Sequence, residues 1–272
     1  MFRYGKYSVL MSVYQSDNCD FFVQAIDSML NQTIKSDDFV LVIDGPIFGK
    51  LKNVVKEYAN KYKEIHLISL EKNMSLGNAL AEGMKHCRYE LVARMDSDDI
   101  SIYDRCEKQL KTFAENPDLD ILSGQVAEFE NDIKHIFSYR KIPVKHEDIV
   151  KFAKRYSPFN HPVVMYKKSS VISVGGYQDF LRNEDYYLWV RMIMNGAKTQ
   201  NLPDTLLYYR ASYENIQRKS SWSQTKNSIK LHYVFQKMGF ASFMDTIFLM
   251  CIHLTIFLMP TKFFWWAYKN IR

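Results

Sequence analysis

The first half of the chain alternates short, continuously apolar runs with longer stretches of helical period. Predicted strands span 7–14, 39–43, 65–70 and 89–95, and predicted helices span 20–31, 51–62, 76–87 and 101–114. Ser75 is placed to cap the third helix, and Ser101 with Asp104 resembles a capping box for the fourth. Strands without polar alternation are buried on both faces, so the pattern predicts an α/β fold whose parallel sheet is covered by helices on both sides. Ligands bind such sheets at the carboxyl ends of the strands.

The second half is less regular and ends in a region of different character. Predicted strands span 121–129, 163–166 and 206–210, and predicted helices span 147–154 and 185–195. From about Ile216 onward a basic helical stretch precedes an almost uncharged run and an aromatic, basic tail. The basic residues of that stretch are Arg218, Lys219, Lys226, Lys230 and Lys237.

The net charge and the cysteine pattern limit the kinds of partner and the cellular compartment that we expect. The 272 residues are 47% hydrophobic, which is enough for a sizeable core, and the net charge of +6 is only mildly basic. No dense basic stripe is present, so we expect no nucleic-acid partner, whereas diphosphates and lipid headgroups suit this charge. The four cysteines form no C-x-x-C pair, and the first residues contain no apolar signal segment. We therefore expect reduced thiols and a cytoplasmic location.

Three carboxylates stand directly after the fourth predicted strand, in the sequence Asp96-Ser97-Asp98-Asp99. Carboxylates this close repel one another unless a cation neutralises them, and their oxygens are the ligands that Mg²⁺ and Mn²⁺ prefer. An isolated D-x-D is more often a solvated acidic turn. The position after a buried strand, at the expected ligand edge of the sheet, favours a metal site.

Two other acidic motifs are ambiguous from spacing alone. Glu184 and Asp185 follow Asn183 and precede an amphipathic helix. A carboxylate there could act as a general base. An acidic first turn is also favoured by the helix dipole, without any catalytic role. Asp44 begins the sequence Asp-Gly-Pro after the second strand, which is first of all a turn. His161 and the pair Gly175-Gly176 are more often structural than functional. No phosphate-binding glycine loop of the P-loop or dinucleotide type occurs.

Taken in order, the motifs resemble the family-2 glycosyltransferases of bacterial capsule, exopolysaccharide and lipopolysaccharide synthesis, which have the GT-A fold. The resemblance runs from Ser8 to about Trp222. Each matching motif is weak alone, and only the whole set in this order is specific for the family. They are 8–14 (SVLMSVY), 28–33 (SMLNQT), 40–46 (VLVIDGP), 73–80 (NMSLGNAL), 93–100 (ARMDSDDI), 160–162 (NHP), 175–177 (GGY) and 184–189 (EDYYLW).

The resemblance implies a role for each matching residue. It favours a functional role for Asp44 over a simple turn, and for Asp185 over a merely acidic first turn of a helix. It implies a nucleotide-sugar donor, usually a UDP-sugar, a bound Mn²⁺ or Mg²⁺, and a glycan acceptor that is lipid-linked. The implied nucleotide and donor contacts are Ser12, Val13, Tyr14, Asp44, Asn73, Gly77, Arg94 and Asp96. The implied metal ligand is Asp98, with Asp96 and Asp99 beside it, and the implied base of an inverting displacement is Asp185, with Glu184 next to it.

The same resemblance suggests the domain organisation. Residues 1–215 would form the catalytic domain, with a nucleotide-binding half of about 1–100 and an acceptor half of about 101–215, and 216–272 would form a helical appendage. Processive members carry a Gln-x-x-Arg-Trp motif that 217–222 (QRKSSW) does not match, so we expect transfer of a single sugar. Arg218 and Trp222 remain candidates to close over the diphosphate or the acceptor.

Three rival functions can be weighed against the sequence. A sugar-phosphate nucleotidyltransferase would need a glycine-rich, basic loop after the first strand, where this chain has Gln15-Ser16-Asp17-Asn18. A haloacid-dehalogenase-type phosphatase follows its D-x-D with Thr or Val, not with an aspartate such as Asp99. A non-catalytic, membrane-associated binding protein would have no need of Asp98 and Asp185.

The run 243–259 is apolar enough to seek lipid, with Asp245 and His253 as its ionisable residues. It is shorter than the roughly 20 residues that span a bilayer, so we expect it to lie in the membrane interface, at the inner face of the cell membrane. The following tail interleaves Trp and Tyr with Lys and Arg, which favour headgroups. The alternatives are a helical hairpin packed on the catalytic domain and a dimer interface. The transferred sugar, the acceptor and the oligomeric state are not readable from the sequence.

Overall fold

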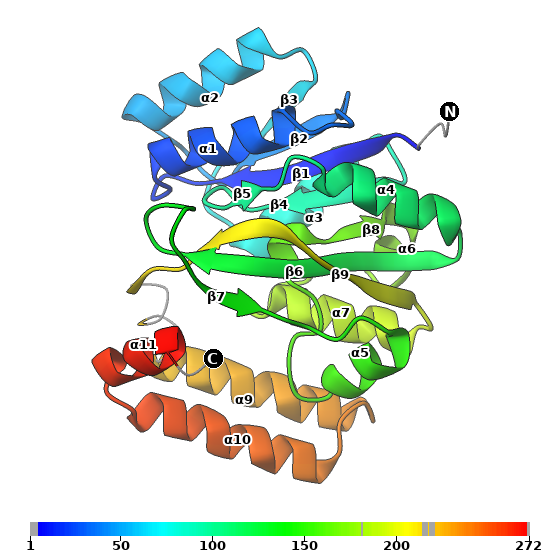
Figure 1. Ribbon diagram of the computed structural model, residues 1–272, viewed down its shortest axis with the longest axis vertical. Helices are drawn as coiled ribbons and strands as arrows, with labels where there is room; N and C mark the ends of the chain where they lie inside the picture. Colours follow the sequence, from blue (N-terminus) through cyan, green and yellow to red (C-terminus); the bar gives the residue numbers. More distant parts are fainter. Residues whose placement is uncertain (1–4, 181, 214–216, 218–220, 271–272) are drawn as a thin grey trace.

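One mixed sheet lies at the centre of the computed structural model, which describes residues 5–180, 182–213, 217 and 221–270 (Figure 1). Its strand order is β3-β2-β1-β4-β8-β6-β9-β5, with β7 paired to β6. The strands are β1 (Tyr7–Val13), β2 (Phe39–Ile43), β3 (Ile65–Ser69), β4 (Leu91–Met95), β5 (Ile100–Ser101), β6 (Leu119–Phe129), β7 (Ile136–Arg140), β8 (Met165–Lys167) and β9 (Lys198–Arg210).

The first four strands are parallel, as predicted; both faces of β1, β2 and β4 are buried, and the edge strand β3 is partly buried. Side chains of β1 alternate between the two cores: Val9 and Met11 pack with α1 (Cys19–Leu30) and α2 (Gly49–Lys61), whereas Leu10 packs with α3 (Leu76–His86). This two-sided burial explains why the strands read as continuous apolar runs. The α/β fold class is confirmed.

The second half of the sheet mixes directions. β8 runs antiparallel to both β4 and β6, and β6 and β9 then run parallel to each other. Sequence analysis did not predict β7, and it began β9 at Leu206 where the strand begins at Lys198. Buried polar side chains hide the apolar pattern by which the start of β9 could have been predicted. Asn201 is one of them: it is fully buried, and it donates to the carbonyls of Pro143 and Pro158 at 2.6 and 3.1 Å.

Three local predictions were wrong in their bounds or in their caps. The strand expected at 163–166 begins two residues later, as β8, after a 3-10 turn, η1 (His161–Val163). The helix expected from Ser101 is α4 (Arg105–Glu115), because Ile100 and Ser101 pair with β9 first. Ser75 and Asp104 stand at the N-cap positions of α3 and α4, but neither side chain accepts a capping hydrogen bond.

The C-terminal region forms a helical hairpin packed on α7 (Glu184–Met194), followed by a third helix. The helices are α9 (Trp222–Lys237), α10 (Phe243–Leu258) and α11 (Thr261–Asn270), and in Figure 1 α9 lies between α10 and α7. Leu231 and Phe235 of α9 pack against Tyr186 and Val190 of α7.

Ion pairs join the hairpin to the segment after α5 (His146–Phe152) and join α11 to the end of β6. Arg155, which follows α5, pairs with Asp245 of α10 at 2.6 Å, and Lys269 of α11 pairs with Glu130 at 2.5 Å. Within the described residues no single helix is long and apolar enough to cross a membrane; α10 and α11 meet that criterion only as a pair bent by 114°. Arg218, Lys219 and the predicted boundary at 215–216 lie outside the described residues.

Candidate functional site

The carboxyl ends of β1 and β2 border a cavity of about 330 Å³. Its lining comprises Tyr14, Gln15, Ser16, Asp44, Gly45, Pro46 and Asn73. Tyr14, Asp44 and Asn73, which lie far apart in the sequence, are thereby brought together as the sequence analysis expected. Ser12 and Val13 end β1 next to the cavity, but the side chain of Val13 is buried in the core.

Local geometry fixes Asp44 in this cavity. Its Oδ1 accepts a hydrogen bond from the backbone N–H of Met74 at 2.7 Å. Gly45 has a φ of +84°, and a Cβ there would lie 2.6 Å from the backbone nitrogen of Asn73, so only glycine permits this approach. Burial raises the pKa of Asp44, although the Met74 N–H partly offsets the effect. The result is a rigid hydrogen-bond acceptor in a cavity bordered by an aromatic ring.

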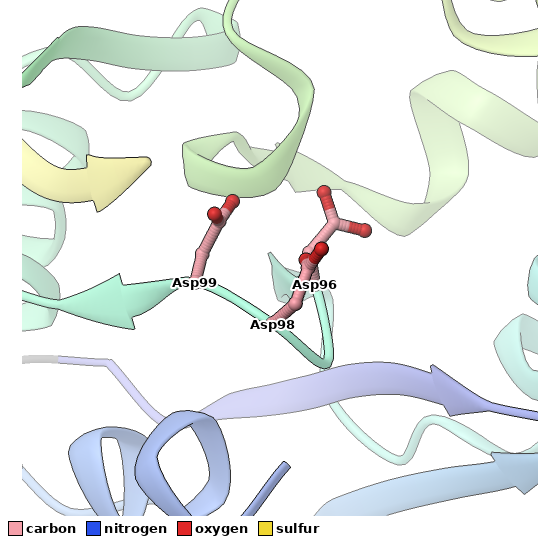
Figure 2. A group of neighbouring side chains, drawn as sticks. All are labelled: Asp96, Asp98 and Asp99. Atoms are coloured by element: carbon pink, nitrogen blue, oxygen red, sulfur yellow. The ribbon is translucent and has the colours of Figure 1, made fainter. Parts of the chain in front are cut away.

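Asp96, Asp98 and Asp99 lie on the loop between β4 and β5, and Figure 2 shows their side chains pointing to the same side of that loop. One oxygen of each lies within 4.8 Å of the others. Burial raises the pKa of Asp98 and of Asp99, and the neighbouring carboxylates raise both further. Bringing a cation among these oxygens would relieve that repulsion, and three hard carboxylate oxygens at this spacing fit Mn²⁺ or Mg²⁺.

Two residues of this cluster were missed by the sequence analysis. Asp17 accepts a hydrogen bond from the Ser97 hydroxyl at 2.8 Å, and its charge contributes to the raised pKa of Asp98. Arg210, at the end of β9, donates its backbone N–H to Asp99 at 2.8 Å and its Nε–H to the carbonyl of Asp98 at 2.9 Å. The position of Asp17 just after the first strand, at the expected ligand edge of the sheet, could have identified it. No sequence motif identifies Arg210.

Arg94 lies at the centre of the site. It is 1% exposed and forms an ion pair with Asp96. Arg105, fully buried on the far side of β4, donates to the carbonyl of Arg94 at 2.7 Å and to that of Pro162 at 3.2 Å. The backbone that carries Arg94 is therefore clamped to η1, and the guanidinium has a fixed position between groups of carboxylates.

Glu184 and Asp185 form the first turn of α7. Burial raises the pKa of each carboxyl group, and the positive charge of Arg94 partly offsets the rise. Gly77 of α3 packs against Glu184 so closely that a Cβ on Gly77 would lie 2.9 Å from the Glu184 Cβ. Gly77, Arg94, Asp96, Glu184 and Asp185, all singled out from the sequence, thus lie in one region.

His161 has a structural position beside Arg94. Its Nε2 lies 3.0 Å from the Tyr177 hydroxyl, and Tyr177 belongs to the Gly-Gly-Tyr motif. Burial, and then the nearby charge of Arg94, holds the pKa of His161 well below its ordinary value. A neutral imidazole that hydrogen-bonds Tyr177 supports the wall behind Arg94 without adding charge to the site.

The comparisons with known proteins agree with this geometry. The model of the family described as glycosyl transferase family 2 matches residues 8–175. The chain is 38% identical to an uncharacterized glycosyltransferase of Haemophilus influenzae, over 94% of this chain and 95% of that protein. It is 35% identical to an Escherichia coli UDP-Gal:alpha-D-GlcNAc-diphosphoundecaprenol beta-1,3-galactosyltransferase, over 98% of this chain and 96% of that protein.

A solved structure shares the fold. The mannosyltransferase PcManGT from Pyrobaculum calidifontis, solved in complex with GDP-Man and Mn²⁺, superposes with a TM-score of 0.63 at 16% identity. The match covers 83% of this chain and 64% of that one. At this identity the likeness establishes the GT-A architecture alone.

The contact between Gly77 and Glu184 yields a testable consequence. In Gly77→Ala the added methyl group should push the start of α7 away from α3, and we expect turnover to fall about tenfold or more because a small misplacement of reacting groups is costly. Ser75→Ala, two residues away and without a capping hydrogen bond, is the matched control. Equal turnover of the two variants would show that the close approach does not matter.

Proposed function

This chain belongs to glycosyl transferase family 2, and from that premise we propose that it is an inverting enzyme that transfers one sugar from a UDP-sugar to a lipid-linked glycan acceptor in cell-surface polysaccharide synthesis. The observation that carries the proposal is the juxtaposition at one edge of the sheet of an aromatic-bordered cavity, three clustered carboxylates and a second pair, the buried Glu184 and the half-buried Asp185.

The cavity at the ends of β1 and β2 suits the nucleoside. Tyr14 borders it with an exposed aromatic ring, and the fixed carboxylate of Asp44 can accept a hydrogen bond from an N–H of the base. We propose uridine because the E. coli relative is named for UDP-Gal and because uracil has such an N–H. Asn73 and Gly77 would frame the donor beside this cavity.

Asp98, with Asp96 and Asp99, would hold Mn²⁺ or Mg²⁺. A bound divalent cation would neutralise the donor diphosphate and stabilise it as a leaving group. Arg94 adds a fixed positive charge behind Asp96, and Asp17 orients Ser97 in the same loop. These residues would bind and orient the donor without taking part in proton transfer.

The second pair of carboxylates would serve the acceptor. In the proposed displacement an acceptor hydroxyl oxygen bonds to the anomeric carbon, the bond from that carbon to the diphosphate oxygen breaks, and the hydroxyl proton passes to Asp185. Because the attacking oxygen and the leaving group lie on opposite faces of the sugar, the anomeric configuration inverts. Glu184 lies next to Asp185 and is the alternative base.

The acceptor and the location are proposed from the C-terminal helices. Both ionisable residues of the apolar run face the protein: Asp245 pairs with Arg155, and His253 stacks on His232 with ring centroids 5.9 Å apart. The outward face of α10 is left uncharged and apolar. Its exposed large hydrophobic residues are Phe243, Met244, Ile247, Phe248, Met250, Leu254, Phe257 and Leu258, and Cys251 and Thr255 are exposed as well.

An uncharged helical face of this kind suits the membrane interface. Exposed Trp266 and Lys262 on α11 suit a headgroup layer next to it. We propose a cytoplasmic enzyme at the inner face of the cell membrane, with its packed hairpin lying on the lipid. The E. coli relative is named for a diphosphoundecaprenol-linked acceptor, which such an enzyme would meet there.

The metal proposal predicts the behaviour of Asp98→Ala. Without this ligand the diphosphate loses its counter-charge, so turnover should fall by about 10²-fold or more and UDP should bind more weakly. Asp148→Ala, on the surface of α5, is the control. Turnover would be measured against Mn²⁺ concentration; full activity of Asp98→Ala, or of the wild type in excess chelator, would refute the metal role.

The base proposal predicts both a variant and a pH profile. Asp185→Asn should bind UDP normally and lose about 10²-fold or more in turnover, because an amide cannot take the proton. Since burial raises the pKa of Asp185 above the ordinary value of about 3.9, the wild type should lose activity as the pH falls through that raised value, well before pH 4. If Glu184→Gln is inactive and Asp185→Asn is not, the base is Glu184.

The membrane proposal predicts the behaviour of a triple variant. Replacing Phe243, Met244 and Ile247 by Ser should abolish co-sedimentation with phosphatidylglycerol vesicles while donor hydrolysis continues, because none of these side chains supports the site. Replacing the exposed Phe48, Tyr103 and Tyr139 by Ser is the control of equal size. Wild-type protein that stays in the supernatant at low salt would contradict membrane binding.

A further inference from the structure

The apolar face of α10 has two unlike ends. At its beginning, Phe243 and Met244 are 62% and 68% exposed and lie next to the Asp245–Arg155 pair, beside α5. At its other end, Phe257 packs against Trp222, the first residue of α9, with ring centroids 5.1 Å apart and ring planes at 49°. The two ends are about 21 Å apart along a helix of this length.

The Trp222 end adjoins the catalytic helix. Gln224, in the same first turn of α9, donates from Nε2 to the Asn183 side chain at 3.4 Å. Asn183 is the N-cap of α7 and directly precedes Glu184 and Asp185. The first turn of α9 therefore contacts α10 through the Trp222–Phe257 pair and contacts, through Gln224, the start of the helix that carries the proposed base.

A positive charge lies beside this path. Lys230, two turns along α9 from Trp222, places its ammonium 5.8 Å from the centre of the Phe180 ring, in the segment that leads to Asn183. An exposed aromatic ridge next to an exposed cation complements a ligand with an apolar chain and an anionic head. Trp222 is 50% exposed and Phe257 is 38% exposed, so both rings are accessible to such a chain.

We propose that Trp222 and Phe257 form a binding site for the isoprenoid chain of the acceptor lipid, with Lys230 beside its diphosphate. This inference rests on the proposed lipid-linked acceptor. A bulk phospholipid could cover any part of α10, but only a lipid whose own head group must reach Asp185 gains from a path that ends at Asn183. The ridge would hold the chain as it leaves the membrane and so set the position of the acceptor sugar.

Two soluble probes test this site without a membrane. With UDP and Mn²⁺ present in excess to fill the donor site, calorimetry would compare farnesyl diphosphate, which has three isoprene units, with dimethylallyl diphosphate, which has one. We expect the wild type to bind the longer probe about tenfold or more tightly, because additional methyl and methylene groups are buried.

Three kinds of variant separate the parts of the site. Trp222→Ala and Phe257→Ser should each bring the ratio of the two affinities close to one. Phe243→Ser, on the same face but at the far end of α10, should keep the wild-type ratio. Lys230→Gln should weaken both probes by a similar factor, because both carry the diphosphate.

The outcomes distinguish this inference from the proposed function. Equal affinity of the wild type for both probes, or equal loss in Phe243→Ser and Trp222→Ala, would overturn the chain site. Concentration-dependent dimerisation of the wild type that is lost in Trp222→Ala, without discrimination between the probes, would assign the face to a second copy and also overturn it. Donor hydrolysis is the separate readout of the proposed enzyme: if the wild type hydrolyses no nucleotide-sugar, the proposed function fails whatever the probes show.

Discussion

The buried guanidinium of Arg94 is the interaction on which the site depends. A buried cation is stable only when it is paired and hydrogen-bonded, and here Asp96 supplies the paired charge. The same positive charge moderates the raised pKa values of Asp98, Glu184 and Asp185. Arg94 is thus a fixed cation shared by the carboxylates proposed to hold the metal and those proposed to serve the acceptor.

The fold keeps this cation in place from several directions. Arg105 clamps the backbone carbonyl of Arg94, and Arg210 fixes Asp98 and Asp99 from the end of β9. Because the supporting bonds come from α4 and β9, the carboxylate loop is held by elements that follow it in the chain. The donor edge built by the parallel strands is therefore completed only when the mixed half of the sheet has formed.

Sequence analysis was strongest where the signal is local. The parallel strands could be predicted because burial makes their sequences continuously apolar. The aspartate cluster could be predicted because Asp96, Asp98 and Asp99 are neighbours along one loop. Asp17 and Arg210 escaped because their contacts join segments that are 80 and 111 residues apart in the chain. Likewise the helix at 243–259 was recognised as apolar, but its pairing with Arg155 depends on a contact 90 residues away, which no local pattern encodes.

The central claim is that one edge of the sheet binds a uridine diphosphate through a divalent cation held by the aspartate cluster. Calorimetric titration of the full chain with UDP, GDP, ADP and CDP, with and without Mn²⁺, tests it most directly. The account predicts that UDP binds in the presence of Mn²⁺, about tenfold or more tightly than the other nucleotides, and that a chelator removes this binding. Equal binding of all four nucleotides, or UDP binding that is unchanged by the chelator, would contradict it.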